Sequence, residues 1–371
     1  MDQARSQVRL MVSGKLNRRH FVAALAAGGL VPTFVVSAAT KTPQVVRRWA
    51  SGNATLAPLA WVDGHVFFNG DTSVGRIDPD SDGLVWNTPH GLSSNAVYRP
   101  RAAGQSVISG GQRELGAWNM ADGQRRWLHK AILQVGTPFV TPERTYVGDG
   151  HELLALNNQT GHIDWRFADE VDCTASYAPT VANGTVFFGP GNGLLYALNE
   201  ADGKLKWQLD EKAKWQYVRQ MYVTGNMLIA GTYTELLYGI DVNSGKVKWT
   251  FKAGNFINSH HVSGDTAYLW SPVGYIYAID VDTGAVRWKH QTTVYGNNAA
   301  NWGHMMAEIV TFENQVYCLD MKQMLHVLDA DTGRERLRIP FAHDLRPTVL
   351  PLAGGRAVMA SDTGEVQLAQ W

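Results

Sequence analysis

The chain is poor in the features that mark charged partners and disulfide frameworks. Its 371 residues contain 33 Lys and Arg against 33 Asp and Glu, and no basic run stands out after residue 40. We therefore expect no nucleic-acid partner. Only two cysteines are present, Cys173 and Cys318. Because a disulfide requires Cα atoms within about 7 Å, we favour two free buried thiols.

Several catalytic signatures are also missing. The sequence contains no G-x-S-x-G, no H-E-x-x-H, no P-loop and no G-x-G-x-x-G in a βαβ context. Serine hydrolase, zinc protease and nucleotide-dependent activities therefore lack support. The Cys and His spacing of a structural zinc site is absent as well.

The first 40 residues differ in kind from the rest. A basic polar stretch leads to three segments in order, namely NRRHFV at 17–22, an apolar run at 23–36 and Ser37-Ala38-Ala39. This order predicts a twin-arginine export signal over residues 1–40 and a mature domain over 41–371. The alternative is a retained amphipathic anchor or a chance arginine pair. Met1 and Met11 are both compatible with the true start.

A signal of this kind predicts a secreted or periplasmic protein. The apolar run is short and rich in Gly and Ala, whereas a spanning helix needs about 20 strongly apolar residues. No cysteine follows the run to carry a lipid, so we expect no membrane anchor after cleavage. Because this pathway usually carries folded proteins, it weakly favours a cofactor or a fast-folding enzyme.

One short sequence motif, called the repeat phrase below, recurs along most of the chain. A hydrophobic residue and Asp or Asn lead through a Gly turn to a large apolar residue, which is in turn Trp86, Trp127, Trp165, Trp207, Trp249, Trp288 and Leu337. Successive ends lie 41, 38, 42, 42, 39 and 49 residues apart. A period near 40, with strand-like segments in each unit, predicts the blades of a β-propeller rather than a helical solenoid.

The unit over 178–207 shows the order of four short strands. The turn at Asn183-Gly184 predicts a hairpin between the first two strands, because Asn and Gly tolerate positive φ. The Asp-Gly turn at 202–203 predicts a type I turn closed by a Gly bulge. Trp207 then lies on the outermost strand, where we expect its ring to wedge between neighbouring blades.

Segments at the two ends of the chain complete the ring. Residues 346–350, 357–360 and 365–369 resemble the first three strands of another unit, and residues 45–49 resemble a fourth strand that ends in Trp49. Joining them predicts an all-β, eight-bladed β-propeller closed by pairing of the N-terminal strand with the C-terminal strands. Such closure removes free sheet edges. Seven blades is the alternative.

The phrases that end at Trp165, Trp207, Trp249 and Trp288 resemble the tryptophan-docking repeats of the pyrroloquinoline quinone (PQQ) type β-propellers. The resemblance covers nearly all of the chain after residue 40. It implies calcium- and PQQ-dependent alcohol and sugar dehydrogenases on one side, and non-catalytic scaffolds such as the outer-membrane assembly lipoprotein on the other. The adjacent cysteines that often lie beside the quinone in those dehydrogenases are absent here.

The segments that cross between units are expected to reach the central channel, where a propeller places its site. They supply the cofactor-binding candidates Tyr177, Trp215, Arg219, Asn258, Asn297, Trp302 and Arg346. Aligned units place Tyr177, Arg219 and Asn258 at one equivalent position. The segment 290–308 is the longest, and Trp302 within it suits stacking on a flat ligand. The alternative is an ordered loop that seals the channel.

Cations in these segments suit an anionic cofactor. Arg219, Arg346 and Arg99 can each bind a carboxylate through the guanidinium fork, and PQQ has three carboxylates. The candidates for the catalytic base are His260, His261, His304 and Asp172. The resemblance to sugar-type dehydrogenases implies a histidine in this role.

A metal bound through histidine is not favoured. His260, His304 and His343 lie on consecutive crossing segments, but single histidines satisfied by the backbone are more common. The resemblance implies calcium with oxygen ligands, because quinone chemistry needs a Lewis acid, and examples of such ligands are Asp172, Glu308 and Asn297.

Two functions stay open. The first is an exported oxidoreductase that uses PQQ and Ca²⁺ to oxidise a small alcohol or amine, an exported natural product among the candidates. The second is a non-catalytic exported scaffold that binds a protein or glycan partner. Polar and aromatic residues concentrated in crossing segments favour the enzyme, whereas an exposed apolar patch would favour the scaffold. We expect a monomer that acts on a small molecule.

Overall fold

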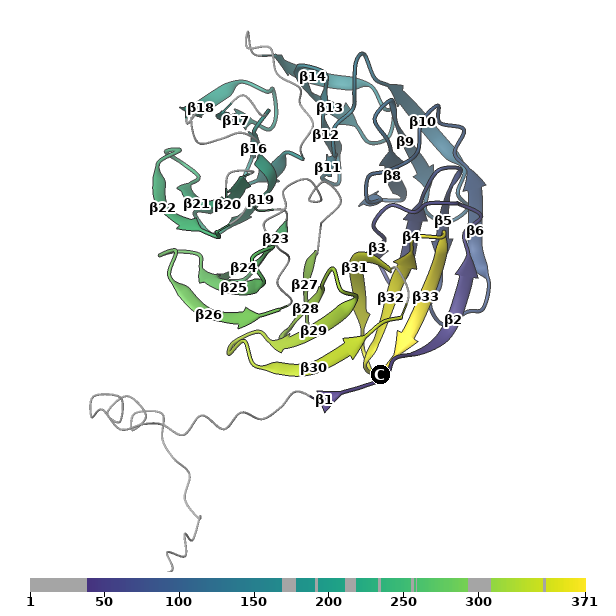
Figure 1. Ribbon diagram of the computed structural model, residues 1–371. Helices are drawn as coiled ribbons and strands as arrows, with labels where there is room; N and C mark the ends of the chain where they lie inside the picture. The colour runs from purple at the N-terminus through teal and green to yellow at the C-terminus, as the bar shows by residue number, and fades with distance from the viewer. Residues whose placement is uncertain are drawn as a thin grey trace, which may run out of the picture. The chain divides into compact units, whose positions relative to one another are not determined.

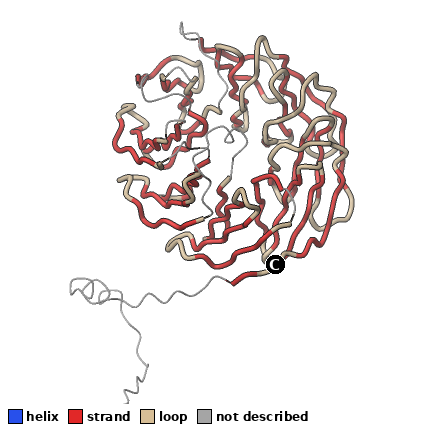
Figure 2. The backbone as a smooth tube through the Cα atoms, viewed as in Figure 1, coloured by secondary structure: helices blue, strands red, loops and turns tan. Residues whose placement is uncertain are grey.

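The computed structural model describes residues 39–168, 178–190, 193–210, 218–232, 235–254, 257, 259–292, 308–342 and 345–371. These residues form strands joined by turns and loops, and helix is absent from them (Figure 2). Within the described ranges no helix is therefore long and apolar enough to span a membrane.

Eight sheets stand in a ring, one for each blade, and each contains four antiparallel strands (Figure 1). The first blade contains β3 (Ala60–Val62), β4 (His65–Asn69), β5 (Ser73–Ile77) and β6 (Leu84–Pro89), and the second contains β7 (Arg101–Ala103), β8 (Ser106–Gly110), β9 (Glu114–Asn119) and β10 (Arg125–Lys130). The third contains β11 (Phe139–Val140), β12 (Arg144–Asp149), β13 (Glu152–Asn157) and β14 (Ile163–Ala168). The fourth contains β15 (Thr180–Ala182), β16 (Thr185–Phe188), β17 (Leu194–Asn199) and β18 (Leu205–Asp210).

The next three blades follow the same order. The fifth contains β19 (Val218–Thr224), β20 (Met227–Thr232), β21 (Leu236–Asp241) and β22 (Val247–Lys252). The sixth contains β23 (Ser259–Ser263), β24 (Thr266–Ser271), β25 (Tyr275–Asp280) and β26 (Val286–Gln291). The seventh contains β27 (Ile309–Phe312), β28 (Gln315–Leu319), β29 (Met324–Asp329) and β30 (Glu335–Pro340). A short strand, β1 (Ala39–Thr40), adds to the outer edge of the seventh blade by parallel pairing with β30.

The eighth blade joins the two ends of the chain. It contains β31 (Leu345–Leu352), β32 (Arg356–Ser361) and β33 (Glu365–Gln370), and β2 (Gln44–Ala50) supplies the fourth strand by antiparallel pairing with β33. In Figure 1 the purple β2 lies beside the yellow β33. The prediction of eight blades closed in this way is confirmed, and the alternative of seven is wrong.

The turns have the backbone geometry that their residues predict. Asn183 and Gly184 have φ of 51° and 68°, so both central positions of the first hairpin are left-handed. Before the last strand of the same blade, Gly203 has a φ of 72°, and the pairing of β17 with β18 shifts register between Ala197 and Leu198. That shift lies at Lys206, beyond the turn. The predicted Gly bulge is formed by Gly203 and Lys204 opposite Asn199, whose carbonyl oxygen accepts from Gly203 N–H at 2.8 Å and whose N–H donates to the carbonyl of Lys204 at 2.7 Å.

Each outer-strand tryptophan docks on the blade that follows it. The indole of Trp207 donates a hydrogen bond from Nε1 to the carbonyl oxygen of Val242 at 2.9 Å. Its ring also covers Gly245, where a Cβ atom would lie 2.7 Å from the indole. The equivalent acceptors for the other six tryptophans are the carbonyls of Ser81, Met120, Asn158, Glu200, Val281 and Ala330.

The seventh blade lacks the tryptophan. Leu337 takes its place and belongs to a core cluster with Trp371 at the end of the chain. The predicted wedge between blades is therefore confirmed at seven of the eight seams and is replaced at the eighth by Leu337 in a mixed aliphatic and aromatic cluster. Cys318 is a buried free thiol in this same blade, as expected.

Candidate functional site

The first strands of the blades stand around the central axis and define its channel. β15, β19, β23, β27 and β31 contact one another in sequence, and β7 contacts β11. Each of these strands ends at a hairpin turn, which gives a common register. Ala103, Thr224, Ser263 and Phe312 occupy the same position, because each is the last paired residue before that turn.

This register places polar side chains at two levels along the channel. Four residues before the common position stand Arg99 in the second blade and Glu308 in the seventh. Two residues before it stand Arg101, Tyr222 and His261, in the second, fifth and sixth blades. Side chains alternate along a strand with a period of two, so both sets face the same way.

A cavity of about 330 Å³ opens between these strands. Its lining comes from six blades and includes Ala60, Arg101, Tyr222, His261, Val310 and Leu350. Contributions from blades on opposite sides of the ring identify it as part of the central channel. A volume of this size lies within the range of small-molecule sites.

Two arginines and one glutamate give the described lining of the cavity a net positive charge. Arg99 forms an ion pair with Glu308, which takes up the only carboxylate in the described lining of the cavity. Burial, reinforced by the nearby charge of Arg101, lowers the pKa of Arg99 to about 10. The described lining thus holds two guanidinium groups and one carboxylate in a partly desolvated space, which favours an added anion.

Arg101 is the arginine of the cavity that the ion pair of Arg99 with Glu308 does not include. Across the described ranges no carboxylate forms an ion pair with it, and burial lowers its pKa from the ordinary value. Placing an arginine in such a space is costly unless an anion compensates its charge. The guanidinium fork presents two parallel donors, the arrangement that binds a carboxylate most strongly.

The two predicted histidines differ in accessibility. His260 is 2% exposed, and its Nε2 lies 3.4 Å from the carbonyl oxygen of Ile229. Burial lowers the pKa of His260 to about 4, so its imidazole is neutral. His261 is only partly buried, and its Nε2 lies 3.0 Å from Oγ1 of Thr311. Burial, together with the charge of Arg99, also lowers the pKa of His261.

Tyr222 links these groups. Its ring meets the edges of both imidazoles, with centroids 5.1 Å from His260 and 5.7 Å from His261. Burial raises the pKa of Tyr222 to about 12, while the two arginines act in the opposite direction. The phenol therefore keeps its proton at neutral pH and can serve as a hydrogen-bond donor.

Of the remaining sequence candidates, Arg346 is the one whose side chain the structure describes, and it lies away from this cluster. Arg346 lies in β31, and its Nε stands 3.0 Å from Oδ1 of Asp362, with the side chain 36% exposed. It is therefore a surface ion pair of the eighth blade and not part of the described channel lining. The other candidates lie outside the described residues, namely Asp172, Tyr177, Trp215, Asn258, Asn297, Trp302, His304 and the side chain of Arg219.

Sequence reasoning missed Arg101 and Tyr222. It aligned only the units that begin near 178, 220 and 259, and it looked for function in the longest crossing segment. Counting back two residues from the hairpin position in every unit would have selected both residues, because the hairpin is visible in the sequence.

The channel residues fit the cofactor of the PQQ-type enzymes in part. Arg101 and Arg99 suit its carboxylates, and the cavity suits a small polar ring compound. Calcium fits less well, because the described lining offers one carboxylate, Glu308, and Arg99 already binds it. A calcium ion prefers six to eight oxygen ligands.

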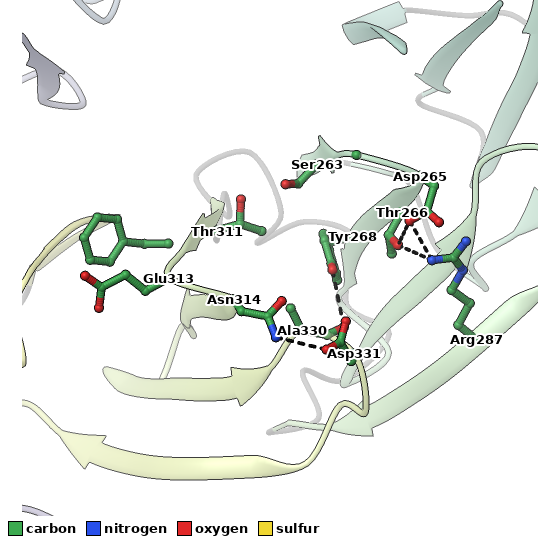
Figure 3. Close-up of a pocket in the computed structure, with 12 residues that line it drawn as sticks. Ser263, Asp265, Thr266, Tyr268, Arg287, Thr311, Glu313, Asn314, Ala330 and Asp331 are labelled. Atoms are coloured by element: carbon green, nitrogen blue, oxygen red, sulfur yellow. Dashed lines mark hydrogen bonds and ion pairs between the residues drawn. The ribbon is translucent and has the colours of Figure 1, made fainter. Parts of the chain in front are cut away.

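A second cavity lies at the seam between the sixth and seventh blades (Figure 3). Its volume is about 470 Å³. Arg287 binds Asp265 at 2.7 Å and Asp280 at 2.6 Å, and Nδ2 of Asn314 donates to Asp331 at 3.0 Å. Hydrogen bonds from Arg287 and Thr283 lower the pKa of Asp280 to about 2. Because these charges are paired within the protein, the hollow is better explained as part of the seam.

The fold is an eight-bladed β-propeller, and the described lining of its axial cavity is polar with a net positive charge. The family model described as outer membrane protein assembly factor BamB matches residues 70–290 and 273–369. These matches cover most of the sequence, so the chain belongs to this family. The resemblance to PQQ-type propellers is confirmed at that level. No curated protein matches the chain.

Solved structures share the fold at low sequence identity. BamB from Moraxella catarrhalis is 17% identical with a TM-score of 0.69, over 89% of this chain and 100% of that one. A quinohemoprotein alcohol dehydrogenase from Pseudomonas putida HK5 is 11% identical with a TM-score of 0.67, over 88% of this chain and 76% of that one. A computationally designed protein is 13% identical with a TM-score of 0.72, over 87% of this chain and 99% of that one. Both an assembly factor and a dehydrogenase thus share this fold.

Proposed function

We propose that the protein is an exported oxidoreductase of the quinoprotein type, which binds a polycarboxylate quinone in the central channel. The observation that carries the proposal is Arg101, a cation in the channel without a described carboxylate partner. A scaffold that acts only through its outer faces has no need for such a group. An anionic ligand supplies the missing compensation.

The chain's own residues divide the work of such a site. Arg101 holds one carboxylate of the ligand, and Arg99, fixed by Glu308, adds attraction at the neighbouring level. Tyr222 donates a hydrogen bond to the ligand ring. When bound, PQQ supplies the carbonyl that accepts hydride from an alcohol or amine.

His261 is the group best suited to take the substrate proton. Its lowered pKa keeps the imidazole neutral at physiological pH, so one ring nitrogen can accept a proton. His260 is less suited, because it is almost fully buried and its pKa of about 4 makes it a weak base. The exported location rests on the twin-arginine pattern over residues 1–40.

A quinone-binding experiment tests the proposal. The full chain is titrated with PQQ, with the quinone absorption as readout, and reduction of a redox dye is followed with a panel of small alcohols and amines. Arg101→Gln is expected to weaken PQQ binding at least ~10-fold, because charge-assisted hydrogen bonds are lost. The exposed Arg126→Gln is the control and should leave binding unchanged.

The histidine is tested separately. His261→Gln should keep PQQ binding and lose turnover, whereas His260→Gln should affect turnover less. Absence of both PQQ binding and turnover in the wild-type chain would contradict the oxidoreductase.

A scaffold is the second candidate, and one surface feature favours it. Ile132 and Leu133 are 65% and 62% exposed on the segment between β10 and β11. Their backbone N–H groups donate to the buried carboxylate of Asp149, at 2.9 Å and 3.1 Å for the two bonds. An adjacent pair of exposed aliphatic side chains on a fixed backbone is suited to docking a polypeptide.

Displayed peptides test this second function. Peptides selected on the wild-type chain should lose affinity for an I132S/L133S double variant and keep it for Val286→Ser, which changes an exposed valine of another blade. Peptides that bind all three proteins equally would contradict docking at this pair.

A further inference from the structure

The outer part of the seam between the sixth and seventh blades gathers two histidines and a glutamate. His290 comes from β26, His326 from β29 and Glu335 from β30. One ligand atom from each lies within 4.8 Å of the other two, and this is the sole group of at least three such side chains in the described ranges. None of them lines the channel cavity.

The spacing within the cluster is close to that of a coordination shell. Nδ1 of His326 lies 2.6 Å from Oε1 of Glu335, and Nε2 of His290 lies 3.7 Å from the same oxygen. Two tetrahedral ligands at 2.0–2.1 Å from a zinc ion stand about 3.3 Å apart. The observed separations fall on both sides of this value, so side-chain shifts of about 1 Å would complete the geometry.

His290 gives an independent sign that a ligand is missing. Its Nε2 is buried and has no hydrogen-bond partner, although it points towards the carboxylate of Glu335. Buried polar atoms are nearly always satisfied, and an exception calls for an explanation such as an absent ion. A lone pair on this nitrogen is free to coordinate.

His326 is held as a metal ligand by the residue behind it. Its Nε2 lies 3.3 Å from Oδ2 of Asp320, whose other oxygen accepts the backbone N–H groups of Lys322 and Met324. Without a metal, Nδ1 donates to Oε1 of Glu335 and Nε2 to Asp320, so the imidazole is held between two carboxylates. A metal ion at Nδ1 would replace the proton there, while the hydrogen bond to Asp320 keeps the proton on Nε2. A carboxylate behind the imidazole is the usual outer-shell support of a metal-binding histidine.

An open position remains on the cavity side. His326 borders a cavity of about 420 Å³, which is also lined by Thr292, Met324 and Arg338. Arg338 donates to Oε2 of Glu335 at 2.7 Å and, from Nε, to Oε1 at 3.3 Å, and Oε1 also faces both histidines. Three protein ligands with an adjoining space match a zinc centre whose fourth position takes water or a small ligand.

We propose that His290, His326 and Glu335 bind one divalent transition-metal ion of the zinc class, which bridges the sixth and seventh blades. Two imidazoles and a carboxylate are donors that suit Zn²⁺ and Co²⁺ and are too few in oxygen for Ca²⁺. Because the ligands come from two blades, the bound ion crosslinks a seam of the ring. Asp320 is a positioning residue.

Cobalt titration tests the site. The full chain without a histidine tag is stripped with EDTA and titrated with Co²⁺, with the visible d–d absorption as readout, and Zn²⁺ is then added as competitor. About one Co²⁺ per chain is expected, with intense bands of low coordination number that Zn²⁺ abolishes. Zn²⁺ should also raise the thermal unfolding midpoint, because it binds only the folded chain.

Variants separate the site from adventitious binding. His290→Gln is expected to weaken Co²⁺ binding at least ~10-fold and to remove the Zn²⁺-induced thermal shift. It should fold, because the replaced nitrogen makes no hydrogen bond in the protein. His162→Gln changes an exposed histidine of the third blade and is expected to bind like wild type. Asp320→Asn should weaken binding while keeping the same bands.

Two outcomes would overturn the proposal. One is the absence of d–d bands in the wild-type chain at millimolar Co²⁺. The other is equal Co²⁺ affinity in wild type, His290→Gln and Glu335→Gln, which would assign any bound metal to another place.

Discussion

Arg99 of the second blade and Glu308 of the seventh form an ion pair across the central channel. The two residues stand at the same register position, four residues before the hairpin position of their blades. The pair therefore follows from the repeat symmetry and ties together blades that are not neighbours in the ring. It also accounts for one arginine of the channel and leaves Arg101 without a carboxylate partner among the described residues.

Breaking this pair should change stability and anion affinity together. Glu308→Gln leaves two arginines without a carboxylate, so we expect a loss of about 1–2 kcal/mol in the free energy of unfolding, less than for a fully buried pair. The affinity for PQQ should rise, because Arg99 is released. Urea denaturation and PQQ titration measure the two effects.

The matched control for this substitution is a surface pair. Arg356 binds Asp80 at 3.1 Å, with 31% and 77% of the two side chains exposed. Asp80→Asn should change the free energy of unfolding by less than about 0.5 kcal/mol and leave PQQ affinity unchanged. A Glu308→Gln variant that behaves like Asp80→Asn in both measurements would show that the channel pair has no special role.

The tryptophan seams should carry much of the stability. Trp207→Ala removes a large ring packed on Gly245 and a hydrogen bond to Val242, so we expect a loss of roughly 3–5 kcal/mol in the free energy of unfolding. Trp61 is 44% exposed in the channel, and Trp61→Ala should cost less than about 1 kcal/mol. Equal shifts of the urea midpoint for the two variants would contradict docking as the source of the stability.

The fold could be predicted from the sequence to the level of the eighth blade, and the reason is physical. Each unit carries its own turn residues and its own Trp207-like wedge, so local signals are repeated many times. Closure followed from Trp49, because a lone fourth strand at one end needs three strands at the other. Because the same turn and tryptophan pattern recurs in each unit, a weak pattern in one unit does not change the predicted fold.

The candidate site could be predicted only in part. His261 and Arg99 were selected because of their residue types in crossing segments, and both line the channel cavity. Arg101 was missed because its role depends on which partner Glu308 takes, and that pairing joins residues 209 positions apart. Arg346 was selected for the same chemistry as Arg99, but Asp362 in the adjoining turn binds it.

Acid should destabilise the protein through His260. Its pKa is about 4 in the folded chain, below the ordinary value of 6.5, because burial disfavours the charged form. Between these values the unfolded chain binds more protons, so this part of the stability is complete above pH 6.5 and is lost as the pH falls towards 4. The expected slope is at most ~1.4 kcal/mol per pH unit.

A neutral replacement isolates this effect. His260→Gln should flatten the dependence of the free energy of unfolding on pH across that window, whereas the exposed His162→Gln should keep the wild-type slope. Urea denaturation at a series of pH values measures both. Parallel curves for wild type and His260→Gln would mean that other groups set the acid sensitivity.

The N-terminal strand should be essential for closing the ring. β2 pairs with β33 from Gln44 to Ala50, and it carries Trp49, which is 2% exposed. Deletion of residues 1–50 exposes the edge of β33 and removes the indole of Trp49. We therefore expect a loss of at least ~3 kcal/mol in the free energy of unfolding, and association of chains through the unpaired edge. Deletion of residues 1–43 removes β1 and keeps β2, and it should leave a cooperative monomer. Size-exclusion chromatography and urea denaturation compare the two chains, and identical behaviour would show that the eighth blade closes without its fourth strand.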